Sequence, residues 1–178
     1  MKKSIREGGK LMFTVESYTG TLEEKYSLLN KQLAALIEGE DNLIAILSNT
    51  SALLNVFLKE INWVGFYLLE NNNMLVLGPF QGLPACIRIP IGRGVCGTAA
   101  RNKETIIVED VEKFPGHIAC DAASRSEIVI PLFQSGELIG VLDIDSPNVN
   151  RFSEAEAKHL QNFVNILGIH LSTIQKKK

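Results

Sequence analysis

The order of hydrophobic periodicities along the chain constrains its fold more than any other feature of the sequence. Two segments with helical spacing of apolar residues come first, strand-like segments broken by glycines follow, and a further helical segment comes last. This order is typical of an antiparallel sheet whose helices gather on one face. The sequence therefore predicts an α+β fold, with a central antiparallel sheet covered by N- and C-terminal helices on one face. Ligand-enclosing loops are predicted to close the other face.

Three helices are predicted from their capping residues and apolar stripes. A capping box opens the first, over residues 21–39. The second begins with Asp41 as its N-cap and ends near Ile61. The third begins at Ser153, which is expected to form another capping box with Glu156.

Between these helices the pattern changes to short apolar runs separated by turn residues. The predicted strands are 63–69, 74–77, 86–89, 105–109, 127–133 and 138–145. A short helix over 95–102 follows a glycine-rich turn. Residues 110–126 carry little regular signal, and a loop of this length inside a domain is usually functional or disordered.

The length of 178 residues fits one domain, which we assign to 21–178, with residues 1–20 as an N-terminal tail or leader. The net charge of -2 gives no basic surface for nucleic acid and no polybasic membrane patch. No apolar run reaches the roughly 20 residues of a membrane span. The start of the chain lacks the apolar core of a secretory signal, so a cytoplasmic protein is expected.

Three cysteines, Cys86, Cys96 and Cys120, are the first candidates for chemistry. In the reducing cytoplasm they do not form a structural disulfide framework, so they are buried apolar residues, metal ligands or redox groups. No C-x-x-C pair exists, which argues against zinc-ribbon and thioredoxin-like sites. Taken singly, a cysteine is more often a small core residue. Cys120 departs from this expectation because it lies in the long loop, beside Asp121 and near His117.

Cys96 lies in a glycine-rich turn at the start of the predicted short helix, where a helix N-terminus lowers the pKa of a thiol. The run GRGVCG matches neither the Walker A pattern nor the dinucleotide fingerprint, so nucleotide binding is disfavoured.

Asp143 and Asp145 are two residues apart in an apolar strand and therefore share one face. Glu127 opens the strand that should pair with theirs, and counting outward from the turn puts all three carboxylates at one end of the hairpin. A solvated sheet edge is one interpretation. The other is a cluster that binds a cation, whether a metal, a lysine or a ligand ammonium, or that keeps one proton as a general acid.

Trp63 and Tyr67 also share a strand face, with Gly65 between them. Core packing is the commoner role for such a pair, and an aromatic wall for an apolar ligand group is the functional alternative.

Several segments taken together resemble the free methionine-R-sulfoxide reductases, which are stand-alone enzymes with a GAF fold. The segments are 62–67 (NWVGFY), 78–82 (GPFQG), 93–97 (RGVCG), 115–121 (PGHIACD), 124–127 (SRSE) and 140–146 (GVLDIDS). The resemblance covers about residues 21–175, and the three cysteine contexts together make it specific. It implies a GAF-like catalytic domain.

The resemblance also implies roles for the cysteines. Cys120 corresponds to the usual nucleophile and Cys86 to its resolving partner, so a Cys86–Cys120 disulfide is expected on oxidation. Cys96 corresponds to a third redox cysteine, and the choice between Cys120 and Cys96 as the attacking thiol stays open.

The remaining implied site residues bind the substrate. The acids at the ammonium and sulfoxide end and the aromatic side of the pocket correspond to Glu127, Asp143, Asp145, Trp63 and Tyr67. The implied reaction reduces free L-methionine-R-sulfoxide through sulfenic acid and disulfide intermediates. Thioredoxin is the expected external reductant, with no metal and no prosthetic cofactor.

Two alternatives remain beside this interpretation. One is a GAF sensor for a small ligand of the cyclic-nucleotide type, disfavoured because no output segment accompanies the domain. The other is a metal site built from the cysteines and His117, disfavoured by the absence of short ligand spacing. The N-terminal helices offer a face for a homodimer, which one sequence leaves open.

Overall fold

The computed structural model of the chain describes residues 6–7, 10–11, 18–71, 73–116, 118 and 122–174. A six-stranded antiparallel sheet with the order β5-β4-β3-β8-β7-β6 forms its centre. The strands are β3 (Trp63–Glu70), β4 (Met74–Gln81), β5 (Arg88–Pro90), β6 (Ile106–Val108), β7 (Ser126–Gln134) and β8 (Glu137–Ser146). Two short strands, β1 (Arg6–Glu7) and β2 (Lys10–Leu11), pair with each other apart from this sheet.

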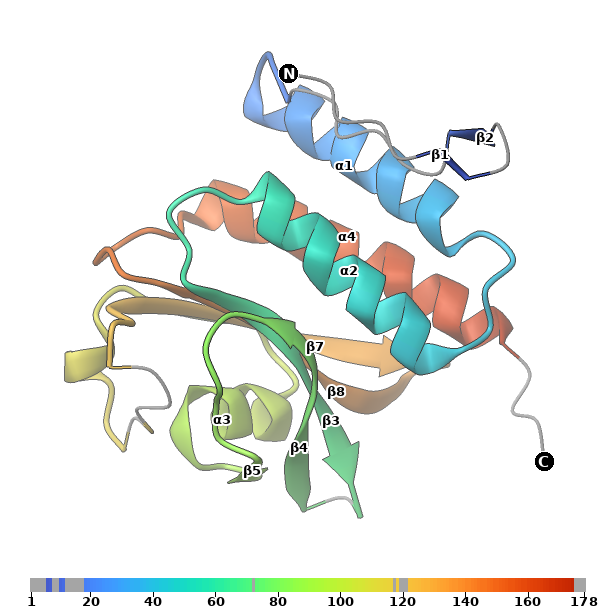
Figure 1. The fold of residues 1–178 in the computed structure, drawn as a ribbon. Coiled ribbons are helices and arrows are strands. Elements are labelled where there is room, and N and C mark those ends of the chain that lie inside the picture. Colours follow the sequence, from blue (N-terminus) through green and yellow to red (C-terminus); the bar gives the residue numbers. More distant parts are fainter. Residues whose placement is uncertain are drawn as a thin grey trace.

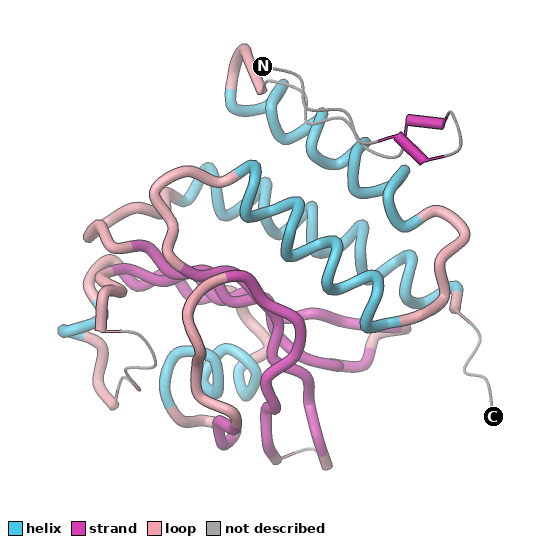
Figure 2. Tube along the Cα trace, viewed as in Figure 1, coloured by secondary structure: helices cyan, strands magenta, loops and turns pink. Residues whose placement is uncertain are grey.

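The helices lie on both sides of the sheet, in unequal numbers. They are α1 (Leu22–Ile37), α2 (Leu43–Phe57), α3 (Gly94–Asn102), α4 (Glu154–Thr173) and the single-turn η1 (Val111–Lys113). Figure 1 shows α2 and α4 on one face of the sheet, with α1 outside them, and α3 on the opposite face; α2 contacts β3 and β4, and α4 contacts β7. The tube in Figure 2 shows the same layers, with long loops beside α3. The predicted α+β arrangement is confirmed.

Strand alternation divides the interior into two cores. On β3, Val64 and Phe66 belong to the large core beneath α2 and α4, while Trp63 and Tyr67 belong to a smaller core beneath α3. Because successive side chains of a strand point to opposite faces, each strand contributes to both cores. The smaller core, which also contains Cys96, is the side on which the candidate site lies.

The limits of α2 differ from the sequence prediction. Its N-cap is Asn42 rather than Asp41, because the Asn42 side chain accepts the bond from the Ala45 amide. The helix ends at Phe57, with Leu58 as its C-cap, and not near Ile61. Adjacent Asp and Asn are both good caps, so their order along the chain did not decide between them.

The strands around β4 also differ from their predicted limits. β4 continues through Gly78 and Pro79, where a bulge interrupts its register with β3. Proline is tolerated there because a bulge leaves a residue outside the ladder. β5 begins at Arg88, so Cys86 lies in the preceding loop rather than on a strand.

Only half of the second predicted capping box forms. Ser153 caps α4 by accepting from the Glu156 amide, as expected. The Glu156 carboxylate instead accepts from Arg151, at 2.6 and 3.4 Å, and from the Tyr26 hydroxyl at 3.1 Å. Arg151, two residues before the cap, and Tyr26 of α1 thus compete with the Ser153 amide for the glutamate.

Among the described residues, no helix is both long enough and apolar enough to span a bilayer.

Candidate active site

The register of three neighbouring strands brings most of the candidate residues together. Asp145 of β8 lies directly opposite Trp63 of β3 on one side and Glu127 of β7 on the other. Asp143 lies two pairs further along, opposite Gly65 and on the same face of the sheet as Asp145. The predicted gathering of the three acids at one end of the β7–β8 hairpin is therefore confirmed by the strand pairing.

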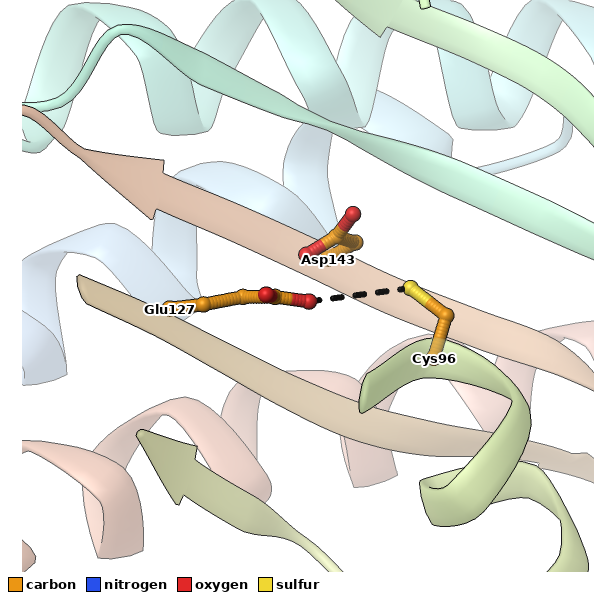
Figure 3. Close-up of side chains that lie close together, drawn as sticks. All are labelled: Cys96, Glu127 and Asp143. Atoms are coloured by element: carbon orange, nitrogen blue, oxygen red, sulfur yellow. Dashed lines mark hydrogen bonds between the residues drawn. The ribbon is translucent and has the colours of Figure 1, made fainter. Parts of the chain in front are cut away.

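Helix α3 delivers a thiol to this acid cluster. The Sγ atom of Cys96 lies 4.0 Å from Oε1 of Glu127, and ligand atoms of Cys96, Glu127 and Asp143 all lie within 4.8 Å of one another. Figure 3 shows the three side chains converging from α3, β7 and β8. Gly97 lets α3 pack closely against the end of β5, because a Cβ there would lie 2.3 Å from the carbonyl oxygen of Pro90.

All three groups of this cluster are buried, and burial dominates their protonation. Burial, and then the charges of Asp143 and Asp145, hold the pKa of Glu127 well above its usual range. Burial raises the pKa of Asp143 to about 6. Both carboxyls of the cluster therefore hold a proton more tightly than exposed carboxyls do, as expected for carboxyls that converge away from water.

The pKa of Cys96 is raised as well, first by burial and then by the charges of Asp143 and Glu127. This is opposite to the effect expected from its place at a helix N-terminus. Desolvation and two carboxyl groups outweigh the helix dipole, so Cys96 is held as a thiol.

One polar atom of the cluster lacks a partner. In the described part of the chain, Oδ1 of Asp143 is buried without a hydrogen bond, and the residue is 6% exposed. A buried acceptor without a donor is costly, and such an atom in a native protein requires an explanation. A ligand that brings N–H donors, above all an ammonium, would satisfy it.

Aromatic rings form the side of the site on β3 and β4. Trp63 stacks on Phe80, with ring centroids 5.3 Å apart, and on Tyr67 at 5.9 Å. Gly65 makes room for this stack, because a Cβ there would lie 2.3 Å from Cβ of Phe80 and 2.8 Å from the Trp63 ring. The rings offer apolar surface beside the acids, as a ligand with an ammonium and an aliphatic side chain requires.

The same rings hold the loop that carries Cys86. Nε1 of Trp63 donates to the carbonyl of Leu83 at 3.1 Å, and the Tyr67 hydroxyl donates to the carbonyl of Cys86 at 3.0 Å. Two hydrogen bonds thus connect the aromatic wall to the loop that carries Cys86.

The two cysteines within the described residues differ in their state. Cys86 is disulfide-bonded, whereas Cys96 is a free buried thiol. Cys120 lies outside the described residues, as do His117 and Asp121.

Comparison with known proteins assigns the chain to a family. The GAF domain model matches residues 50–172. The chain is 54% identical over 155 residues to the free methionine-R-sulfoxide reductase of Escherichia coli, an alignment covering 87% of this chain and 93% of the relative. The chain belongs to the free methionine-R-sulfoxide reductase family.

Solved structures agree with this membership. The fRMsr of Staphylococcus aureus in complex with substrate superposes with a TM-score of 0.79 at 56% identity, covering 88% of this chain and 99% of that chain. The enzyme of Neisseria meningitidis in complex with its substrate gives a TM-score of 0.82 at 42% identity, covering 88% and 95%. The GAF-like fold is thereby confirmed.

Within this reductase fold, a thiol and two carboxyls also form a donor set that a divalent cation such as zinc accepts. The set differs from the metal site considered from the sequence. It uses acids rather than His117, and the disulfide at Cys86 removes that sulfur as a thiolate ligand.

Sequence reasoning missed Phe80 as part of the aromatic wall. The sequence indicated Phe80 only indirectly. Gly65, between Trp63 and Tyr67 on β3, leaves a space that a large residue on the neighbouring strand fills. Finding it required the pairing of Gly65 with Phe80, which the bulge in this hairpin obscures.

Proposed function

We propose that the chain reduces free L-methionine-R-sulfoxide to L-methionine at the cluster of Cys96, Glu127 and Asp143. The observation that carries the proposal is the unpartnered buried oxygen of Asp143, in a carboxyl cluster beside an aromatic wall. Family membership supports the same activity, because relatives that share most of their length with this chain are free methionine-R-sulfoxide reductases.

The carboxyls divide their work between charge and proton. Asp143 and Asp145 hold the substrate ammonium, whose positive charge offsets their mutual repulsion. Burial and the charges of Asp143 and Asp145 raise the pKa of Glu127. Glu127 is therefore the carboxyl that keeps its proton, and it donates that proton to the sulfoxide oxygen. Trp63 and Tyr67 pack against the aliphatic part of the substrate.

Cysteine thiols carry out the reduction. The Cys120 thiolate attacks the sulfoxide sulfur while a carboxyl protonates the oxygen; methionine leaves, and Cys120 becomes a sulfenic acid. The Cys86 thiol then condenses with it, releasing water and forming a disulfide. Two features support this division: Cys86 takes part in a disulfide, and burial raises the pKa of Cys96, which makes this thiol a poor nucleophile.

An external dithiol, thioredoxin, supplies the two electrons that reopen the disulfide. No prosthetic group is required, because thiols alone carry the electrons. We place the reaction in the cytoplasm, where such reductants are maintained. Residues 21–178 act as the single catalytic domain, and a homodimer through the N-terminal helices belongs to the same proposal.

Selectivity for the free amino acid tests the whole proposal. Turnover of free L-methionine-R-sulfoxide with a thioredoxin system should far exceed turnover of the S epimer or of a peptide-bound sulfoxide. A peptide-bound residue has no free α-ammonium for the acids to hold. Comparable rates on all three substrates would contradict the proposal, and binding without turnover would favour a GAF ligand sensor.

Cysteine variants test the assigned roles. Cys120→Ser should abolish turnover, whereas Cys86→Ser should complete one turnover and stop as a sulfenic acid. Trapping with a sulfenic-acid reagent and peptide mapping measure both outcomes. Full single-turnover activity in Cys120→Ser would transfer the nucleophilic role to Cys96.

A further inference from the structure

We propose that the loop over residues 82–87 is the docking surface for the dithiol protein that reduces the disulfide at Cys86. The proposal rests on the proposed function, and it adds the surface at which the reductant binds. It commits to one occupant, a protein whose accessible cysteine is surrounded by apolar residues.

Exposure of large apolar side chains around the disulfide is the first observation. Leu83 is 63% exposed and Ile87 is 68% exposed, and they lie on either side of the half-buried Cys86 in the sequence. Two exposed apolar side chains beside a reactive disulfide offer apolar contact area to a partner at the bond where it reacts. The disulfide identifies the partner, because only a thiol can exchange with it.

The loop is held in place for such a contact. Its carbonyls accept hydrogen bonds from the Trp63 indole and the Tyr67 hydroxyl, and the Ile87 carbonyl accepts from the Leu77 amide at 2.9 Å. These anchors fix the backbone while leaving the Leu83 and Ile87 side chains outside. A preorganised surface binds with a smaller loss of conformational entropy.

A polar rim borders the apolar pair. Arg88 follows Ile87 and forms an exposed ion pair with Glu70, with 2.6 Å between Nη1 and Oε2. An apolar centre with a charged border is the usual composition of a protein–protein interface.

The exchange itself balances in two steps. The partner's thiolate attacks Sγ of Cys86, forming a mixed disulfide while the other sulfur of the original disulfide leaves as a thiolate and takes up a proton. The partner's second thiol, as its thiolate, then attacks its own sulfur in the mixed disulfide and releases Cys86. The chain gains two electrons, and the partner becomes a disulfide.

The test compares a protein dithiol with a small one. In the double variant Leu83→Ser/Ile87→Ser, kcat/KM for thioredoxin should fall about tenfold or more, because apolar contacts at the centre of an interface carry much of its affinity. Turnover driven by dithiothreitol and KM for methionine sulfoxide should not change, because neither depends on these side chains. The matched control is Ile169→Ser on α4, which removes a 69% exposed isoleucine away from this loop and should leave both reductants unaffected.

Three results would count against the docking surface or the function on which it rests. An unchanged kcat/KM for thioredoxin in the double variant would overturn the docking surface. An equal loss with dithiothreitol would also overturn it, since the loop would then act through the fold. Absence of turnover in the wild-type protein with either reductant would instead contradict the proposed function.

Discussion

Both faces of the sheet bury a carboxyl group, and the two groups are treated in opposite ways. On the helix-covered face, Glu156 accepts bonds from Arg151 and Tyr26. On the α3 face, Asp143 keeps a buried oxygen without a partner among the described residues, next to a second carboxyl and a thiol. The first arrangement stabilises the fold, whereas the second is costly until a ligand completes it.

Neighbouring residues of β8 show the same contrast between stabilising packing and a reactive cluster. Leu142 and Ile144 enter the large apolar core, while Asp143 between them faces Cys96. A strand can therefore contribute to stability and to chemistry at once, because alternate side chains leave on opposite sides. Stability that the helix-covered face supplies allows the α3 face to hold groups that burial disfavours.

The largest expected effect is on the chemistry of the α3 face. Glu127→Gln should lower kcat by about 10²–10⁴-fold with little change in KM, because a general acid contributes about that much. Steady-state kinetics with free methionine-R-sulfoxide measures it. Asp143→Asn is the comparison variant, and it should mainly raise KM.

Near-wild-type kcat/KM in Glu127→Gln, Asp143→Asn and Asp145→Asn alike would remove the carboxyls from the mechanism and make the contrast between the faces meaningless.

On the helix-covered face, breaking the partnered carboxyl should cost stability rather than activity. Arg151→Ala should lower the free energy of unfolding by about 1–3 kcal/mol, because it leaves the Glu156 carboxylate short of donors. Urea unfolding measures the loss. Arg151→Lys should recover part of it, and an unchanged stability in Arg151→Ala would contradict the assigned role of the pair.

On the α3 face, neutralising the buried carboxyl of Asp143 should preserve stability as the pH rises, rather than cost stability as Arg151→Ala does. Because the pKa of Asp143 is raised to about 6, the folded chain binds this proton more tightly than the unfolded chain does. Its contribution to stability is complete below about pH 4 and is lost as the pH rises through about 6. Asp143→Asn should therefore lose less stability than the wild type between pH 4 and 7, by on the order of 1–3 kcal/mol.

Urea unfolding across that pH range tests the sign. Parallel curves for the wild type and Asp143→Asn would show that Asp143 is not held protonated by burial.

The smallest effect concerns a cap on the helix-covered face. Asn42→Ala should lower the free energy of unfolding by about 1 kcal/mol, because it removes the acceptor for the Ala45 amide. Asn42→Asp keeps an acceptor and should lose much less. Thermal unfolding measures both, and equal losses would contradict the capping role.

The sequence was informative wherever the signal is local or can be counted along the chain. Apolar periodicity placed the helices and strands, and counting from the β7–β8 turn gathered Glu127, Asp143 and Asp145. It failed where two local solutions are nearly equal in free energy, as for Asp41 and Asn42 as caps. It also failed where other side chains compete for a predicted capping residue, as Arg151 and the distant Tyr26 do for Glu156.

By itself, the sequence determined the order of the elements, the alternation of the strands and the types of reactive side chain. Only the tertiary structure decided that α3 delivers Cys96 to the acids and that burial raises the pKa values of this cluster. It also decided that Trp63 and Tyr67 hold the loop of Cys86. Periodicity records which face a residue takes, but a pKa depends on what surrounds the group in space, and desolvation arises only when separate segments exclude water together.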